Sequence, residues 1–499
     1  MHTTSISRDN YEISIQDDHQ GPHILAKSIE NKKNHAIYRH YFRQISKGRF
    51  KKVALSSTNI GHVFSNVKKN GISSGFYLRK EGSVLSNEKI GKLNDNKILI
   101  RHYKTNREKW YTSTGEKLAY HWPIFKKYRE TGFASIIRAT MTLHQVCASR
   151  CSFCSTINRT RKDAISLEEA KIFVKNLHEN QAKFNKKHFA DYNSEYKAAT
   201  GKDIKLRGLI LSGGGQPNLW PHFSDFVRWL SNKDIDLGLI TNGFPKHVAD
   251  EIYKHFKWIR LSITPEDASP FYPSQRFDKQ RIPNAIVNNK EATFGLSYVY
   301  GPWTNDDILK RLEEAANEWN ASYVRVLTDC NLPRKLQLEA HKDLGERLHK
   351  LNFTDSSGQP LGKIFHQLKF HANQKEIGSV WEDNICGLQL YNTFWDTTGH
   401  EVDKKSYCFP CDSVTVLEQE GGNGKAERKF NGSKWGTVFN TEVKTLYSEK
   451  AKSFFNPNDL CKACLFVKNN IEVKTLTKLK DREIRSIVPT QTPEHENFP

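Results

Sequence analysis

Residues 147–154 read Cys147-Ala-Ser-Arg-Cys151-Ser-Phe-Cys154 and come directly after an apolar, β-branched run at residues 135–143. Thiolates at this spacing can hold three irons of a four-iron four-sulfur cluster and leave the fourth iron open to a ligand. Three thiolates with a distant fourth ligand can also hold zinc in a closed structural site. The open iron predicts an enzyme, whereas the closed site predicts a structural metal.

A glycine-rich turn follows the next apolar run. Residues 209–211 precede Ser212-Gly213-Gly214-Gly215-Gln216-Pro217. Glycine adopts positive φ and lets a ligand or a second backbone segment approach closely. We therefore expect a ligand-binding turn at the end of a second strand.

Three more short apolar runs, each bounded by breakers, predict buried strands. They are LGLITNG at 237–243, WIRLSI at 258–263 and YVRVLTD at 323–329, the last taken as the sixth strand. Helical patterns lie between the strands. The alternation over residues 135–330 predicts a parallel α/β sheet with right-handed crossovers.

Two of the helical patterns carry start signals. Ser166-Leu-Glu-Glu169 is a capping-box sequence. A second helix is expected over residues 304–319, with Ile308, Leu312 and Ala316 on one face.

A parallel sheet of this class binds its ligands at the carboxyl ends of its strands. The cysteine loop follows the first predicted strand, the glycines follow the second, Asn242 ends the third and Ser262 lies late in the fourth. We expect these residues to meet at one edge of the sheet.

The Cys-x-x-x-Cys-x-x-Cys spacing resembles the motif of the radical S-adenosylmethionine (SAM) superfamily. The resemblance covers roughly two fifths of the chain and implies a partial (β/α)6 barrel. It implies that Cys147, Cys151 and Cys154 hold a [4Fe-4S] cluster, and that SAM bound there is cleaved reductively to a 5′-deoxyadenosyl radical that takes a hydrogen atom from the substrate. The alternative is a zinc knuckle on an unrelated α/β domain.

The same resemblance implies which residues bind SAM. Phe153 stands where the family places an aromatic residue against the adenine, and Ser262 stands where polar residues reach the ribose. Gly213, Gly214 and Gly215 match the segment that pairs with the amino group of the methionine moiety. Gln216 replaces the acidic residue that is commoner at that position, and Asn242 completes the expected cofactor-binding set.

The C-terminal part holds a second cysteine group. Two Cys-x-x-Cys pairs separated by a long loop can close a four-thiolate tetrahedral site. Cys386, Gly399 and Cys408, with the later Trp435-Gly436, are similar to the SPASM or twitch domains appended to many radical SAM enzymes, and this implies an auxiliary [4Fe-4S] cluster. Zinc remains the alternative, and four of five cysteines would be ligands: Cys386, Cys408, Cys411, Cys461 and Cys464.

Other residues are weaker candidates for chemistry. Cys330, after the sixth predicted strand, could donate a hydrogen atom to a substrate radical, but a single cysteine there is more often a small buried apolar residue. His366, His371 and residues 395–400 could supply acid or base groups, and their alternative is an ordinary loop or surface position.

Length and composition fit a multidomain enzyme of a reducing compartment. The 499 residues are 37% hydrophobic, which allows two or three domains. The first thirty residues lack a signal-peptide core, no stretch is long and apolar enough to cross a bilayer, and clustered cysteines fit metal better than disulfides. We expect a cytoplasmic, oxygen-sensitive protein without a membrane partner.

The predicted domains divide the chain into five parts. They are a basic, mixed α+β N-terminal domain at 1–132, the radical SAM partial barrel at 133–330, a connecting helical segment at 331–384, the cysteine-rich SPASM/twitch-like domain at 385–470 and a polar tail at 471–499. Within the first, strands are expected near residues 11–15 and 53–56, and a helix near residues 35–45.

Charge is concentrated in the N-terminal domain. Residues 1–135 hold 25 Lys and Arg but 11 Asp and Glu, which is +14 of the formal +21 of the chain. Such a domain attracts a phosphate backbone, but it also suits a docking or purely structural role.

Three functions follow from these patterns. A radical SAM enzyme that modifies a peptide or protein comes first, and one that modifies a nucleic acid or nucleotide comes second. The third is a non-catalytic, metal-stapled nucleic-acid-binding protein. Either enzyme needs an electron donor such as flavodoxin or ferredoxin, and the sequence leaves the substrate, the reaction class and the oligomeric state open.

Overall fold

The computed structural model describes residues 114–149, 151–154, 156, 161–263, 282–289, 291–329, 332, 334–355, 360–367, 372–373, 385–397, 407–412, 463–464, 466–485, 488 and 492–499, together with eight N-terminal strands. These strands are β1 (Thr4–Arg8), β2 (Tyr11–Asp18), β3 (Gly21–Ser28), β4 (His35–Arg39), β5 (Phe50–Leu55), β6 (Val63–Lys69), β7 (Ile72–Tyr77) and β8 (Arg79–Lys80).

The N-terminal strands form two antiparallel sheets. One has the order β1-β2-β3-β4-β8 and the other the order β5-β6-β7. The strands predicted near residues 11–15 and 53–56 are confirmed as β2 and β5. The helix predicted near residues 35–45 is wrong over His35–Arg39, because β4 pairs along β3 there and sheet pairing overrides the local pattern.

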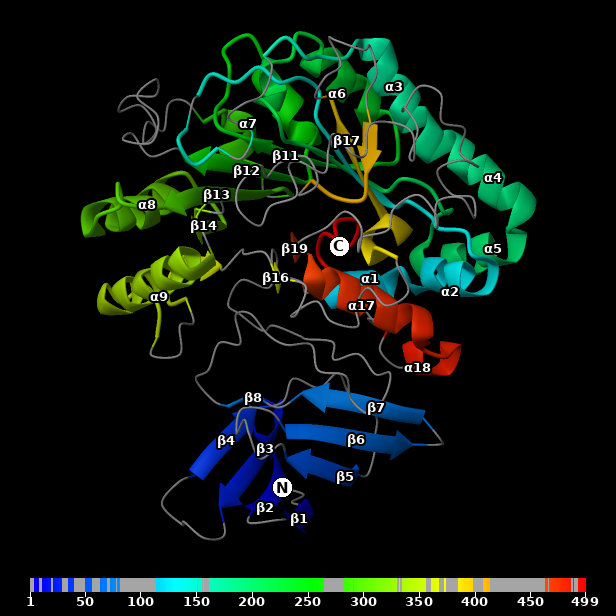
Figure 1. Cartoon of the computed structure of the whole chain (residues 1–499), viewed down its shortest axis with the longest axis vertical. Helices are drawn as coiled ribbons and strands as arrows, with labels where there is room; N and C mark the ends of the chain where they lie inside the picture. The colour runs from blue at the N-terminus through cyan, green and yellow to red at the C-terminus, as the bar shows by residue number, and fades with distance from the viewer. Residues whose placement is uncertain are drawn as a thin grey trace.

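A nine-stranded sheet forms the centre of the remaining described chain (Figure 1), and β16 (Ala372–Asn373) pairs antiparallel with β19 (Ala463–Cys464) outside it. Its order is β15-β14-β13-β12-β11-β10-β9-β17-β18, and every neighbouring pair is parallel except β17 with β18. The strands are β9 (Arg138–Met141), β10 (Gly208–Leu211), β11 (Asp236–Thr241), β12 (Trp258–Ile263), β13 (Thr293–Tyr300), β14 (Tyr323–Thr328), β15 (Ile364–Gln367), β17 (Asn392–Asp396) and β18 (Tyr407–Phe409).

The five strands predicted between residues 135 and 329 are confirmed, and they lie in chain order from β9 to β14. The strand predictions omit β13, although its residues are almost all buried. Helices separate the strands: α3 (Leu167–Lys175), α4 (Gln181–His188), α5 (Ala190–Thr200), α6 (Phe223–Ser231), α7 (Asn284–Val287), α8 (Asp306–Glu318) and α9 (Arg334–Lys350). Short π or 3-10 segments are η1 (Asn176–Asn180), η2 (Pro217–Leu219) and η3 (Asp250–His255).

Both predicted helix starts are found, one of them displaced. The Ser166 side chain accepts from the Glu169 amide and the Glu169 carboxylate accepts from the Ser166 amide, so the capping box of α3 is confirmed. In α8 the cap is Asn305, not Thr304. Leu309 and Leu312 are fully buried there, while Ile308 is only partly buried.

The sheet extends on both sides past the strands β9 to β14. β15 comes from the predicted connecting segment and adds to β14, and β17 comes from the cysteine-rich part and pairs in parallel with β9. The structure therefore joins segments more than 250 residues apart, since Asn392 lies opposite Arg138. η7 (Gly387–Leu390) leads into β17.

The segment predicted as a polar tail is largely buried. α17 (Val467–Lys478) packs against η7, α1 (Thr114–Tyr120) and α2 (Trp122–Thr131), and α18 (Asp481–Arg485) follows it. Residues 495–498 lie at the amino ends of the strands, where Asn497 donates to Asp236 at 2.7 Å and the ring of Phe498 meets Trp258 at 5.6 Å.

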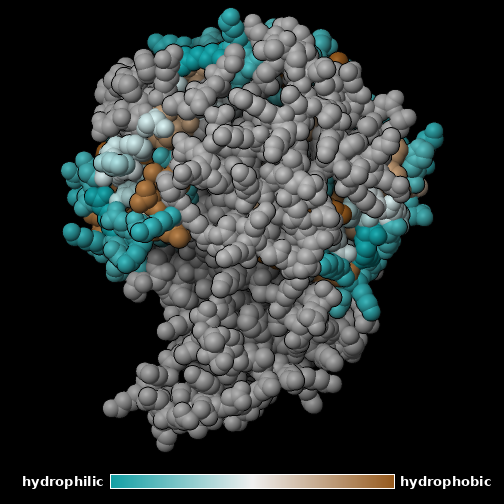
Figure 2. All heavy atoms as spheres, viewed as in Figure 1, coloured by the Kyte–Doolittle hydropathy of each residue, from teal (hydrophilic) through white to brown (hydrophobic). Residues whose placement is uncertain are grey.

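One continuous hydrophobic core joins the sheet, its helices and α17. On the face drawn in Figure 2, the coloured surface is mostly hydrophilic, with brown confined to small areas. Within the described ranges, no helix has the length and apolar character needed to cross a membrane.

Candidate active site

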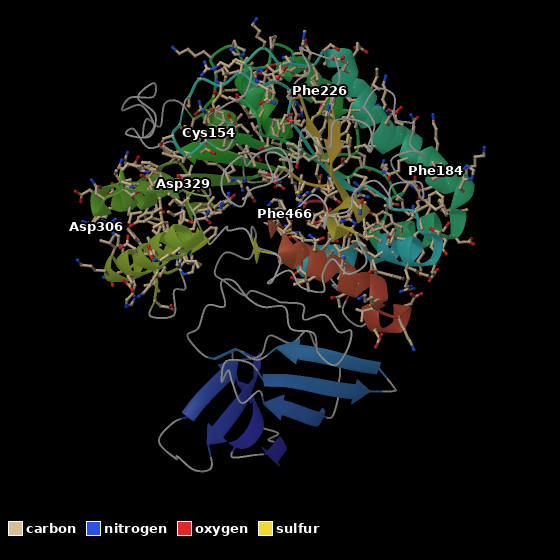
Figure 3. The ribbon with its side chains drawn as sticks, viewed as in Figure 1. Cys154, Phe184, Phe226, Asp306, Asp329 and Phe466 are labelled. Carbon is tan, nitrogen blue, oxygen red and sulfur yellow. The ribbon has the colours of Figure 1, made fainter. Side chains whose placement is uncertain are left out.

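The cysteine loop begins where β9 ends, at the carboxyl edge of the parallel sheet. Cys147, Cys151 and Cys154 are all half-buried, and none of them is in a disulfide. The amide of Cys154 donates to the carbonyl of Cys151 at 3.0 Å, which makes a tight turn. Figure 3 labels Cys154 on this loop and Asp329 just after β14, so both come from the carboxyl ends of strands.

The glycine turn after β10 packs directly on the cysteine loop. The amide of Gly215 donates to the carbonyl of His144 at 3.1 Å, and the amide of Gln216 donates to that of Val146 at 2.7 Å. A Cβ on Gly215 would lie 2.0 Å from the Val146 carbonyl oxygen, so no other residue fits without moving backbone. Gly213 and Gly214 have φ of +85° and +51°, which favour glycine.

Gln216 is a structural link between two loops. Its side chain is 3% exposed and donates to the Gly243 carbonyl at 3.2 Å, while its own carbonyl accepts from His144 Nε2 at 2.7 Å. Burial lowers the pKa of His144, so the imidazole is neutral at pH 7 and Nε2 carries its proton. Gln216 thus holds the loops after β10 and β11 together without any charge.

Two polar side chains reach the thiols, Asn242 from the end of β11 and Thr156 from the cysteine loop itself. The amide of Asn242 donates to Ser149 Oγ at 2.9 Å and lies 3.5 Å from Cys147 Sγ. Thr156 donates to the Gly214 carbonyl at 3.1 Å and lies 3.4 Å from Cys154 Sγ. Sequence reasoning found Asn242 but missed Thr156, because a threonine in a loop carries no signal of its own.

The residue expected at the adenine lies in the loop after β9, and the one expected at the ribose lies on β12. The ring of Phe153 lies 5.6 Å from that of Trp303, which follows β13 and was not predicted. Ser262 is half-buried on β12, opposite Ser297 of β13. Phe153 follows β9 and Ser262 lies near the end of β12, so both lie towards the carboxyl edge of the sheet.

Four cysteines of the C-terminal group are buried: Cys386, Cys408, Cys411 and Cys464. The Asn470 side chain joins two of their segments, since its amide lies 3.7 Å from Cys464 Sγ and its oxygen accepts from the Gly387 amide at 2.6 Å. Burial raises the pKa of Cys386, and it raises the pKa of Cys408 and Cys464 to about 12. These thiols would stay protonated without a cation beside them.

Several predicted residues lie outside the described ranges. They are Cys330, Cys461, His371, Gly399, His400, Trp435 and Gly436. Within the described ranges, no three His, Cys, Asp or Glu side chains form a group that could hold a metal ion. The loop after β9 suits an iron-sulfur cluster by its donor chemistry, because it carries three thiols on one short segment at the carboxyl edge of the sheet.

The acid-base candidates divide into two places. His366 on β15 stacks on His341 of α9 with ring centroids 4.6 Å apart, and burial followed by the charge of His341 lowers the pKa of His366 to about 4. Asp396 ends β17 beside the cysteine loop, 3.4 Å from both Thr142 Oγ1 and Gln145 Nε2. The structure therefore brings Asp396, rather than His366, close to the glycine turn.

No protein-family model and no curated protein matches the sequence. Among solved structures, the chain is similar to Streptococcus suis SuiB bound to S-adenosylmethionine, with 11% identity over 59% of this chain and 65% of that chain and a TM-score of 0.37. The match thus spans about two thirds of the length of SuiB. SuiB bound to the precursor peptide SuiA matches over 70% of this chain and 73% of that chain, with 11% identity and a TM-score of 0.40.

A third similar structure is anSMEcpe with bound AdoMet and Cp18Cys peptide, with 13% identity over 66% of this chain and 88% of that chain and a TM-score of 0.36. All these structures are of radical SAM enzymes.

Proposed function

We propose that this protein is a radical SAM enzyme, with Cys147, Cys151 and Cys154 as ligands of a [4Fe-4S] cluster that binds SAM. The observation that supports it most is the packing of the glycine turn on the cysteine loop. The glycine turn donates two backbone hydrogen bonds, at 3.1 and 2.7 Å, to the segment that leads into Cys147, at the carboxyl edge of a parallel sheet. A zinc knuckle would need no glycine turn beside it.

When bound, the cluster and SAM would supply one-electron reductive cleavage and hydrogen-atom abstraction. The residues of the chain orient the reactants. The turn at Gly213, Gly214 and Gly215 would present backbone groups to the methionine end of SAM. Phe153 would lie against the adenine and Ser262 would face the ribose.

Asn242 would act on the cluster through a thiolate. Its amide lies 3.5 Å from Cys147 Sγ and is oriented by its bond to Ser149. A hydrogen bond to a ligating sulfur stabilises negative charge there and tunes the metal. Thr156 would do the same at Cys154.

The C-terminal cysteines would hold one auxiliary metal site. Cys386 and Cys464 approach each other around Asn470, and Cys408 and Cys411 lie on and just after β18. Four thiolates suit an auxiliary [4Fe-4S] cluster, and zinc is the alternative. A nearby cation would lower the thiol pKa values that burial raises.

A peptide or protein is the substrate we favour, because the spacing of the C-terminal cysteines resembles that of auxiliary-cluster domains, which are commonest in enzymes that modify peptides. The charge of +14 on residues 1–135 favours a nucleic acid or nucleotide as the second candidate. Loss of RNA or DNA binding between low and moderate salt would identify the second. A flavodoxin or ferredoxin would supply the electron.

The test is anaerobic reconstitution of the full chain with iron and sulfide, followed by SAM and a strong reductant. We expect 5′-deoxyadenosine from the wild type, none from Cys151→Ala, and wild-type amounts from Ser152→Ala, an exposed neighbour on the same loop. Iron content and the electron paramagnetic resonance (EPR) signal of the reduced cluster, with and without SAM, are measured in parallel.

Two outcomes would contradict the proposal. One is an iron-loaded wild type whose EPR signal does not change with SAM. The other is a Cys151→Ala variant that is less stable than the wild type but whose folded fraction keeps every activity of the wild type. The non-catalytic alternative predicts this outcome.

A further inference from the structure

Arg260 and Arg325 lie on the face of the sheet opposite its buried core. On β12, Ile259, Leu261 and Ile263 are buried, so Arg260 and Ser262 between them face the other way. On β14, burial alternates in the same manner, and Arg325 is half-buried. The period of two follows from strand geometry.

The strand register places these residues beside the candidate active site. Ser262 of β12, Ser297 of β13 and Arg325 of β14 form one row across three parallel strands. Arg260 lies in the next row towards the amino ends, opposite Gly295. Asn242, which contacts the cysteine loop, comes two residues after Ile240, the β11 partner of Arg260.

No anionic partner offsets the two guanidinium groups in the described part of the structure. Burial, followed by the charge of Arg260, lowers the pKa of Arg325 to about 9, so the Arg325 guanidinium remains a cation at neutral pH. Nε of Arg325 is buried without a hydrogen-bond partner in the described ranges. Arg260 lies over the Trp258 ring at 5.8 Å, which is weak compensation.

Two neighbouring guanidinium groups without an anionic partner lower the stability of the fold, and a bound anion would offset this cost. Like charges in a partly desolvated site repel, and an unsatisfied buried donor is costly. The ring of Tyr323 covers Gly295 beside Arg260, since a Cβ there would lie 2.1 Å from Tyr323 Cζ. The two serines of the neighbouring row offer hydroxyl groups. One carboxylate matches paired guanidinium groups, whereas a nucleic-acid backbone needs a row of exposed cations.

We propose that Arg260 and Arg325, with Ser262 and Ser297, bind a carboxylate of the peptide substrate, from an acidic side chain or a chain end. This site deepens the proposed function and rests on it for the assignment of this face as the substrate chamber. The carboxylate of SAM carries the same chemistry, and the experiment separates the two sources.

The probe is N-acetylglycine, with N-acetylglycinamide as its uncharged match, each titrated against the reconstituted full chain by ligand-observed NMR. The charged probe is expected to bind at least about tenfold more tightly than the amide, or about 1.4 kcal/mol, because a hydrogen bond to a charged group is stronger than one to a neutral group. Arg260→Gln and Arg325→Gln should each abolish this tenfold preference for the charged probe. Arg311→Gln, which breaks an exposed ion pair with Glu318 on α8, should bind as the wild type does.

Adding SAM identifies the source of the carboxylate. Simultaneous binding of SAM and N-acetylglycine, with SAM affinity unchanged in both arginine variants, supports the substrate site. Displacement of the probe by SAM, together with weaker SAM binding in the variants, would assign the arginines to SAM and overturn the proposal. Inorganic phosphate that binds tenfold more tightly than the carboxylate would point to a nucleotide substrate and also overturn it.

Thermal unfolding provides a second readout. Because each substitution removes one of two repelling cations, both variants should melt at or above the wild-type temperature, and N-acetylglycine should raise the melting temperature of the wild type only. Variants that melt well below the wild type would make the arginines structural and overturn the proposal. Arginine-dependent probe binding in a protein that forms no 5′-deoxyadenosine would reject the proposed function and leave the carboxylate site intact.

Discussion

Lys127 is a buried amine whose described partners are neutral. Its side chain is 1% exposed, and Nζ donates to Asn185 Oδ1 at 2.8 Å and to the Ala134 carbonyl at 3.3 Å. Burial lowers the pKa of Lys127 to about 7 from 10.5. Between these values the unfolded chain binds more protons than the folded one, so raising the pH from 7 towards 10.5 favours folding.

We expect the free energy of unfolding to rise between pH 7 and pH 9, with Lys127 contributing up to about 1.4 kcal/mol per pH unit. Lys127→Met should flatten this rise, which denaturant unfolding at several pH values would measure. Lys310→Met, at a side chain that is 55% exposed, should keep the wild-type slope. An unchanged slope in Lys127→Met would show that the amine is charged in the folded protein.

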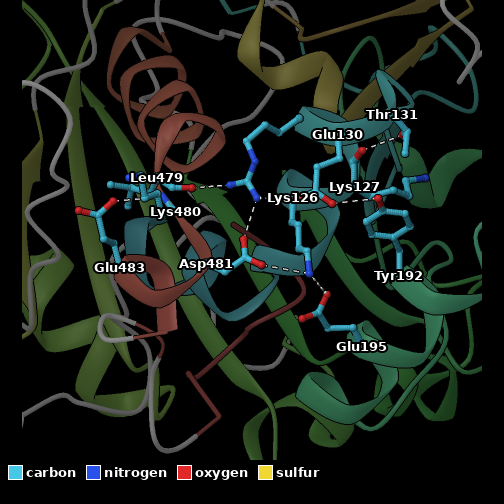
Figure 4. Close-up of polar contacts among 11 residues, drawn as sticks. Lys126, Lys127, Glu130, Thr131, Tyr192, Glu195, Leu479, Lys480, Asp481 and Glu483 are labelled. Carbon is cyan, nitrogen blue, oxygen red and sulfur yellow. Dashed lines mark hydrogen bonds and ion pairs between the residues drawn. The ribbon is translucent and has the colours of Figure 1, made fainter. Parts of the chain in front are cut away.

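At the scale of elements, Asp481 links α18 to α2 by ion pairs (Figure 4). Its carboxylate lies 2.7 Å from Arg129 and 3.1 Å from Lys126, and Lys126 also pairs with Glu195 of α5 at 2.8 Å. Burial acts to raise the pKa of Asp481, but the hydrogen bonds from Arg129 and Lys126 outweigh it and lower the pKa. The carboxylate of Asp481 therefore contributes to the free energy of unfolding at pH values above its ordinary pKa. This contribution disappears as the pH falls through the lowered pKa of the folded protein.

Asp481→Asn is expected to lower the free energy of unfolding by about 1 kcal/mol at pH 7, because the carboxylate is one third exposed and solvent screens its two ion pairs. The loss should vanish at acid pH, where the wild-type carboxyl is protonated as well. Asp225→Asn removes an exposed pair within α6 and should have little effect at any pH. If both variants lowered the free energy of unfolding equally, the ion pairs of Asp481 would not stabilise the packing of α18.

At the scale of the whole molecule, residues 495–498 close the amino edge of the sheet by contacts with four of its strands or their flanks. Thr293 Oγ1 lies 2.8 Å from His495 Nε2, and His121 Nε2 lies 3.0 Å from the Glu496 carbonyl. A Cβ on Gly208 would lie 2.3 Å from the Asn497 carbonyl oxygen, so the segment fits against the strand without space to spare. The two edges of the sheet therefore differ: one carries the candidate active site and the other is sealed.

Phe498→Ala is expected to destabilise the protein by about 3 kcal/mol, because Phe498 is 9% exposed and packs edge-on against Trp258. Phe498→Leu fills most of the space and should cost clearly less. The melting temperatures of the two variants would be compared with that of the wild type. If both melt as the wild type does, the segment contributes no packing energy.

Local patterns were enough for several elements and for the position of the candidate site. The alternation in WIRLSI predicts β12 with its observed ends, and the Ser166–Glu169 pair predicts the start of α3. The order of cysteines, glycines and Asn242 along the chain predicts that they meet at one edge, since parallel strands end together. Their contacts across the loops agree with that prediction.

Long-range pairing could not be predicted in the same way. Periodicity specifies which side of a strand is buried but not which strand lies next to it, so the addition of β17 to β9 depends on a contact between Asn392 and Arg138 that no local pattern encodes. The composition of residues 471–499 predicts a polar tail, yet residues 492–499 are largely buried, and hydrogen bonds to strand ends compensate that burial.

By itself, the sequence of this protein determined five strands of the sheet and the three thiols, because strand period, turn chemistry and metal-ligand spacing all act within a few residues. Only the tertiary structure decided that Thr156 and Asn242 reach the thiols, that Asp396 lies beside the glycine turn and that Arg260 and Arg325 share one face. These proximities arise from strand register and loop packing, which sum weak contacts over the whole chain.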